Sequence, residues 1–425
     1  MENLTRLGQK ITLALLVSQS LFSASSIMVS TVSAIVILQL VDQNSQWAGV
    51  PRTFLLIGAA TIAYPMGRIM DRLGRRRGLS LGYLLGIAGT LVTGVAVIQE
   101  SLLPFLLGIL FIGFTRGTAD LGRYAAAEAN RPERRARAIS LVVLGGTVGS
   151  IVGPTLITFS GQVAVSLDLP ALSGPWFATA LFFLCSLLII NLFLRPDPQE
   201  IARQLEAVSS SPHTSPAAPR SRRPLRAVLR DPRIPLAMVT MIVGQLVMVL
   251  LMAITPVHMH LAHHHISAIS LVVMAHAIGM YGLSFFVGWL VDTVGWDRML
   301  LVGSGFLVSA CLVSPLSLEA TWLGVGLFLL GLGWNCCYVA GSSLLAQSLR
   351  PEEKGRIQGL NDSLINLTSA TGSLGSGLVF AAMGFATMSW LSLGVALVPL
   401  TLFLFFRLTD QLLPRSATKE TGVSL

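Results

Sequence analysis

Long apolar runs, each roughly 18 to 26 residues and nearly free of charge, recur along the whole chain, and about 20 residues of helix cross the hydrocarbon core of a bilayer. The first run stays apolar as far as Leu40, so we interpret it as a retained helix rather than a cleaved signal peptide. The pattern predicts twelve transmembrane helices, at residues 12–40, 53–70, 79–98, 102–127, 137–160, 174–194, 234–257, 267–290, 299–316, 321–346, 357–382 and 387–407.

Composition supports this prediction, because only 12% of the 425 residues are charged while 53% are apolar. A soluble domain carries about 25% charged residues. The positive excess does not indicate nucleic acid binding, since the basic residues gather in every second loop, as cytoplasmic loops do. Of 29 Lys and Arg, 26 fall on that side, one lies opposite (Arg52) and two lie within span four. We therefore predict an all-α polytopic protein of the cell membrane with both termini in the cytoplasm.

A polar, basic segment at residues 195–233 divides the chain and predicts a cytoplasmic linker between residues 1–194 and 234–425. Two passages then repeat themselves across it. The segment from Gly67 to Arg77 matches that from Gly288 to Arg298 at an offset of 221, and residues 131–137 match residues 350–356 at an offset of 219. An even number of spans per copy makes the repeats parallel, so we expect two pseudo-symmetric six-helix bundles.

The segment from Gly67 to Arg77 resembles the signature loop of the major facilitator superfamily, and the weaker copy lies where that family's second half carries it. The resemblance covers essentially the whole chain. It implies a monomer in the lipid bilayer, a central cavity between two bundles, and alternating access to that cavity by rocking of the bundles. It implies no cofactor.

The same resemblance assigns a conformational clamp. It implies that Asp71, with Arg75 and Arg76, holds the outward-facing state against the start of span eleven and with Glu128 at the end of span four. A simple positive-inside topology signal is the alternative interpretation. Arg72 has no basic counterpart in the second copy, so the clamp around the second aspartate should be weaker; the full set comprises Gly67, Asp71, Arg72, Gly74, Arg75, Arg76, Glu128 and Asp292.

Span four carries Arg116, Asp120 and Arg123 at helical spacing i, i+4 and i+7, which places them on one face of a continuous helix. Charges at that depth are costly and mostly face a bundle interior or a cavity, so the triplet is the first candidate for substrate and proton coupling. Asp120 neutralises one arginine only. We expect the other to meet an anionic or carbonyl group of the substrate and Asp120 to be a proton carrier, with a structural ion network as the alternative.

Spans ten and eleven offer further candidates on the opposite side of the expected cavity. Asn335 corresponds to Arg116 by the repeat, and Trp334 and Tyr338 are one turn apart, which suits stacking on a flat substrate as well as plain packing. Asp362 in span eleven is a second titratable carboxylate or an anchor of that helix.

Span five contains a stripe of small residues followed by a proline: Gly145, Gly149, Gly153 and Pro154. Such a stripe lets a neighbouring helix approach closely, and the proline kinks the helix. The string resembles the antiporter motif of proton-coupled drug exchangers, although Ile157 stands where that motif ends in glycine.

Histidines are unevenly placed, with six of seven between residues 258 and 276. Imidazoles bind zinc, copper or nickel and also sense acidic surroundings, so His258, His260 and His263 are weak metal candidates. His276 lies inside a span and either couples to protons or bonds across helices.

Shorter strings around Arg123, Ala138 and Trp334 are similar to a bacterial branch that includes riboflavin-transporter-like members and drug exporters. The leading hypothesis is a proton-coupled secondary transporter that exports a small organic solute by exchange. The alternatives are an importer of an aromatic anion such as a flavin, and a metal-ion carrier. No phosphate-binding loop or nucleophile–base pair stands at a recognisable spacing, which disfavours a membrane enzyme.

Overall fold

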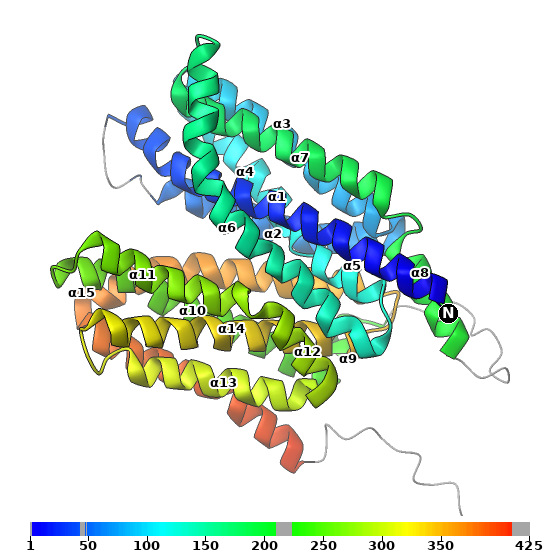
Figure 1. The fold of residues 1–425 in the computed structure, drawn as a ribbon. Coiled ribbons are helices and arrows are strands. Elements are labelled where there is room, and N and C mark those ends of the chain that lie inside the picture. The colour runs from blue at the N-terminus through cyan, green and yellow to red at the C-terminus, as the bar shows by residue number, and fades with distance from the viewer. Residues whose placement is uncertain (1, 43–46, 48, 210–222, 410–425) are drawn as a thin grey trace, which may run out of the picture.

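A computed structural model describes residues 2–42, 47, 49–209 and 223–409. These residues form helices and no strand, as the apolar runs predict (Figure 1). The helices are α1 (Glu2–Leu40), α2 (Val50–Leu73), α3 (Arg75–Ile98), α4 (Leu102–Ala119), α5 (Gly122–Glu128), α6 (Arg135–Ser166), α7 (Gly174–Phe193), α8 (Pro198–Ser209), α9 (Leu225–Leu229), α10 (Arg233–Leu261), α11 (Ile266–Ala277), α12 (Ser284–Val294), α13 (Trp296–Val313), α14 (Ala320–Ser348) and α15 (Lys354–Leu408).

The number of spans agrees with the prediction of about twelve. Among the described residues nine helices are long and apolar enough to cross a membrane, and two bent pairs bring this to eleven. One of the nine, α15, has 55 residues and contains a non-helical break at Gly384 with φ 79°. An unbroken helix of that length would extend about 80 Å, far beyond a bilayer core. Splitting α15 there makes twelve spans, with the break inside the predicted gap between 382 and 387.

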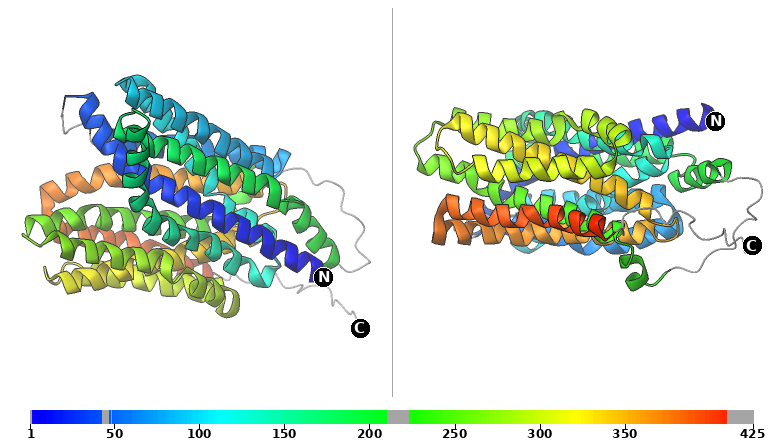
Figure 2. Two further views of the ribbon diagram at one scale, coloured as in Figure 1. Left: turned by 45° about the horizontal axis from the view of Figure 1, so that its top comes forward. Right: turned by 90° about the horizontal axis from the view of Figure 1, so that it is seen from below.

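The helices form two bundles, one of α1–α7 and one of α10–α15 (Figures 1 and 2). One end of the molecule carries the N-terminus and the loops at residues 73–75, 129–134, 294–296 and 349–353; we call it the basic end, and the other the far end. In Figure 1 the ribbons of the two bundles lie nearer each other toward the basic end and diverge toward the far end.

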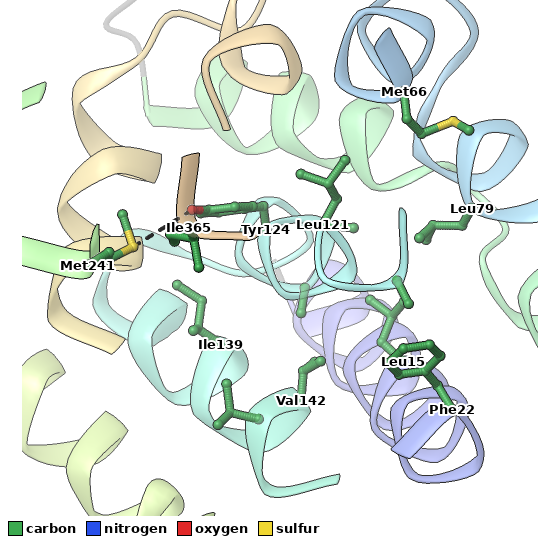
Figure 3. Close-up of a cluster of buried hydrophobic side chains, with 14 of the residues drawn as sticks. Leu15, Phe22, Met66, Leu79, Leu121, Tyr124, Ile139, Val142, Met241 and Ile365 are labelled. Carbon is green, nitrogen blue, oxygen red and sulfur yellow. Dashed lines mark hydrogen bonds between the residues drawn. The ribbon is translucent and has the colours of Figure 1, made fainter. Parts of the chain in front are cut away.

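Glycine crossings bring the bundles together at the basic end. A Cβ on Gly67 of α2 would overlap the carbonyl oxygen of Gly355 in α15, and a Cβ on Gly359 would overlap that of Ala63. Absence of a side chain at these positions therefore lets two backbones touch. The apolar core continues across the seam, where the Tyr124 hydroxyl of α5 lies 4.0 Å from the Met241 sulfur of α10 (Figure 3).

The segment predicted as a linker is partly helical. Residues 210–222 lie outside the described part, but α8 precedes them and buries Ile201, Ala202 and Leu205. Gln199 of α8 donates a hydrogen bond to the Met70 carbonyl at 2.9 Å. The first third of the predicted linker therefore packs on the first bundle, because its apolar residues recur at i, i+1 and i+4 on one helical face.

Candidate functional site

Asp71 lies at the end of α2 and binds the first turn of α15 in the other bundle. Its carboxylate accepts hydrogen bonds from the backbone N–H groups of Gly355 at 2.6 Å and Arg356 at 2.9 Å. The first amides of a helix have no partner within that helix and carry the positive end of its dipole, so they favour a carboxylate. The contact with the start of span eleven that the resemblance implies is thus present.

Arg75 lies beside this contact, and its charged side chain is fully buried. Its guanidinium binds Glu128 through Nε at 2.9 Å and Nη2 at 2.5 Å, and Nη2 also donates to Gln358 of α15 at 2.8 Å. A bidentate pair of this kind is rigid and well satisfied. The hydrogen bond to Gln358 therefore connects the buried Arg75–Glu128 pair of the first bundle to α15 of the second bundle.

The second copy of the motif makes a corresponding contact. Asp292 at the end of α12 accepts hydrogen bonds from the backbone N–H groups of Ala136 at 2.9 Å and Arg137 at 3.0 Å, at the start of α6. The Arg137 Nε lies 3.7 Å from the same carboxylate. Trp296 stands at the position that corresponds to Arg75 by the offset of 221, so this copy carries no equivalent of the inner arginine.

Two members of the signature loop do not join the clamp in the expected way. Arg72 is exposed, and the backbone N–H of Arg76 donates to Asp197 at 3.0 Å. The N–H of Arg75 donates to the other oxygen of that carboxylate at 3.2 Å, and Gly74 has φ 92°, which a side chain rarely adopts. Asp197 caps α3 and was missed because it falls in the predicted linker; its position directly before a proline and α8 was the available signal.

Arg123 forms a buried ion pair between the bundles. Its guanidinium binds Asp362 of α15 through Nη1 at 2.9 Å and Nη2 at 2.5 Å, and both side chains are buried. Nε donates to Ser342 of α14 at 3.1 Å, and the rings of Tyr124 and Tyr338 lie 4.2 and 4.5 Å from the guanidinium carbon. These three hydrogen bonds and two aromatic rings surround the charge, and a buried arginine requires such partners.

The other two residues of the span-four triplet lie on the same span as Arg123. Helices α4 and α5 together form one span, Leu102–Glu128, and Asp120 and Leu121 between them keep right-handed helical backbone angles. Arg123 donates to the backbone oxygen of Asp120, not to its carboxylate. The Asp120 carboxylate interacts electrostatically with both Arg116 and Arg123. Arg116 and Asp120 are only partly buried, and the ion pair of Arg123 runs between bundles rather than within the span.

The aromatic residues of span ten are already paired with one another. Trp334 stacks on Tyr338 with ring centroids 4.6 Å apart and 15° between planes, and Tyr281 meets Trp334 edge-on at 6.1 Å. The indole N–H donates to Gln245 at 2.8 Å. Asn335 is fully buried, and within the described part of the chain neither atom of its amide has a hydrogen-bond partner.

The small-residue stripe of span five faces its own bundle. A Cβ on Gly145, Gly149 or Gly153 would crowd α1, so the stripe allows α1 and α6 to pack closely. Pro154 lies inside α6. Only the neighbouring Gly146 faces the second bundle, where a Cβ would come within 3.0 Å of the Tyr281 ring.

The histidines for which contacts are seen make separate contacts with other residues. His258 stacks on Phe385 with centroids 4.4 Å apart, and His264 lies 2.8 Å from the Leu318 carbonyl through Nε2. His276 is 3% exposed and its Nδ1 lies 3.0 Å from the Leu327 carbonyl. Over residues 2–42, 49–209 and 223–409 no three His, Cys, Asp or Glu side chains are grouped to hold a metal ion, His260 and His263 included.

Two bundles of helices that are long and apolar enough to cross a membrane indicate a polytopic membrane protein. The family model "Major Facilitator Superfamily" matches residues 14–373 and 263–424, and the chain belongs to this family.

Relatives support the assignment. The chain is 30% identical over 379 residues to the uncharacterized MFS-type transporter YdeG of Bacillus subtilis, covering 88% of this chain and 86% of YdeG. It is 26% identical to the riboflavin transporter RfnT of Brucella anthropi, covering 83% and 85%. The fold is similar to that of the human organic anion transporter MFSD10, with a TM-score of 0.69 at 20% identity over 94% and 99% of the chains.

Proposed function

We propose that the chain is a secondary active transporter that exchanges a small organic solute for protons, in the direction of export, by alternating access. The Arg123–Asp362 pair carries this proposal. It joins α5 and α15 on the side of the bundles where Asp71 and Asp292 also bind across the seam. Opening the basic end requires that these contacts separate.

Separation of Arg123 from an ionised Asp362 inside the protein is costly, since removing one partner of a buried ion pair costs about 3–5 kcal/mol. A proton bound to Asp362 removes the attraction and lowers this cost. Asp120 lies in the same charged region, partly exposed and beside Arg116, and is the proposed point of proton entry. Proton binding thereby favours opening at the basic end, which we propose is the cytoplasmic end.

A proteoliposome assay with an acidic lumen tests the proposal. Flavins, organic anions and cationic dyes are added outside while lumenal pH is recorded. Exchange moves protons out as solute enters, so the lumen becomes more alkaline; symport moves protons in with the solute, and the lumen becomes more acidic. The expected result is alkalinisation that is lost in Asp362→Asn and Asp120→Asn.

The matched control is Asp168→Asn, the same chemical change on an exposed residue of the far-end loop between α6 and α7. It should retain the signal. Solute flux without any change in lumenal pH contradicts proton coupling, and a signal retained in both Asp362→Asn and Asp120→Asn contradicts the assigned carboxylates.

The second candidate is a proton-coupled importer of an aromatic anion. Arg116 interacts electrostatically with Tyr281, whose ring meets that of Trp334 edge-on, and this favours the second candidate. The similarity to a riboflavin transporter favours it too. Solute-triggered acidification with a flavin in the same assay selects this candidate over export.

We further propose that the chain functions as a monomer in the cell membrane, with both termini in the cytoplasm. Residues 1–194 and 234–425 are the proposed moving units. The segment 195–233 links them, and α8 is expected to move with the first unit because it packs there.

A further inference from the structure

A side pocket opens on the seam between the bundles near the basic end, away from the Arg123–Asp362 pair. Its volume is about 350 Å³. Three helices and one loop form it: α1 and α6 of the first bundle, α12 of the second, and the residues before α6. The lining residues are Gln9, Thr12, Leu13, Leu16, Asn130, Arg134, Arg137, Ala138, Leu141 and Phe285.

The pocket is charged at one end and apolar at the other. Arg134 and Arg137 precede and begin α6 at the basic end; Arg134 is exposed, and the side chain of Arg137 is 32% exposed. Leu141 lies seven residues beyond Arg134, about 10 Å deeper at 1.5 Å per residue. Leu13 and Phe285 complete the deeper wall and are 62% and 53% exposed.

The arginines and the apolar side chains of the pocket follow the same order as the headgroup and the acyl chains of a phospholipid in a bilayer. Two guanidinium groups at headgroup depth favour a phosphate, and arginine binds phosphate with two parallel hydrogen bonds. Exposed leucine and phenylalanine side chains below them favour an acyl chain. Basic pockets between transmembrane helices are the usual site for anionic headgroups.

We propose that this pocket binds one anionic phospholipid, with the phosphate between Arg134 and Arg137 and an acyl chain along Leu13 and Phe285. Both bundles contribute walls, and Arg137 is also next to Asp292 of the second bundle. Separation of α6 from α12 would divide the pocket. Bound lipid therefore favours the conformation closed at the basic end.

The test uses the purified full-length protein in nanodiscs of phosphatidylcholine with increasing phosphatidylglycerol. Lipid binding is measured by native mass spectrometry, and thermal unfolding is followed in parallel. We expect saturable binding of one phosphatidylglycerol with a rise in Tm. Arg134→Gln/Arg137→Gln should weaken binding about 30-fold, since each basic residue near anionic lipid contributes roughly 1 kcal/mol.

A second variant tests the apolar part of the pocket separately from its two arginines. Leu13→Trp fills the apolar part without altering either arginine, and it should also remove the bound lipid. The charge-matched control is Arg230→Gln/Arg298→Gln, two exposed arginines of the basic end outside the pocket, which should bind lipid as the parent does. Equal losses in the control and the pocket variant would overturn the proposal, as would retained binding in Leu13→Trp or equal stabilisation by soluble glycerol phosphate. Solute transport is not the readout, so failure of the proposed exchange would leave this result interpretable.

Discussion

Neutralising Asp362 should open the molecule at the basic end. In Asp362→Asn the Arg123 guanidinium keeps its buried position but loses the carboxylate that binds two of its nitrogens. Loss of one partner of such a pair costs about 3–5 kcal/mol in the closed conformation. In the open conformation water hydrates the arginine and most of that cost disappears. The equilibrium should then shift toward the open conformation by roughly two to three powers of ten.

Distance measurements between spin labels test this shift. Labels replace Arg77 on α3 and Arg298 on α13, which are exposed at the basic end of different bundles, after the four native cysteines are replaced. The parent should give one short distance distribution and Asp362→Asn a longer one. Helix content and monodispersity of the variant provide the control for folding.

The double variant Arg123→Met/Asp362→Leu sharpens the test, because it removes both charges and leaves an apolar pair of similar volume. Replacement of both partners of a buried pair is often neutral. The short distance should therefore return. Unchanged distances in Asp362→Asn, or a double variant as open as the single one, would refute the reasoning that the ion pair holds the bundles together.

Three further outcomes are expected with the same labels or by thermal unfolding. Gly67→Ala adds a Cβ against a backbone carbonyl of α15 and should lengthen the distance, while Gly305→Ala, with nothing within 4 Å, should leave it unchanged; equal behaviour would contradict the crossing. Asp71→Asn should open the basic end more than Asp292→Asn, because only the first aspartate lies beside a buried arginine pair; the reverse order would reject this ranking. Arg75→Lys should lower Tm by several degrees through loss of the bidentate pair, as an ammonium cannot form it, and an unchanged Tm would exclude that role.

Much of the fold could be predicted from the sequence because bilayer thickness imposes a length on every apolar run. The boundary between the last two spans is an example, since the break at Gly384 falls in the predicted gap. The contact of Asp71 with the start of α15 also followed from the motif. A carboxylate next to a helix start has few other partners.

The ion pair between Arg123 and Asp362 could not be predicted from the lengths of the apolar runs or from the motif. Arg123 and Asp362 are 239 residues apart, and helix spacing offered Asp120 as the nearer partner. Spacing along one helix indicates which residues share a face, but it does not indicate which residues of the other bundle that face meets. The rotation of each helix about its axis depends on packing between the bundles. The residues near one another in the sequence do not reveal that packing.

The two aspartate contacts at the basic end have a consequence for the origin of the chain. Asp71 binds residues 355 and 356, while Asp292 binds residues 136 and 137. The carboxylate acceptors are 221 positions apart and the backbone N–H donors are 219 apart, so each half contributes the same carboxylate to the other half and receives the same one. Such reciprocity characterises the self-complementary interface of a two-fold homodimer. The single chain therefore has the contact pattern of a fused dimer, in which fusion left each half free to diverge at the inner arginine.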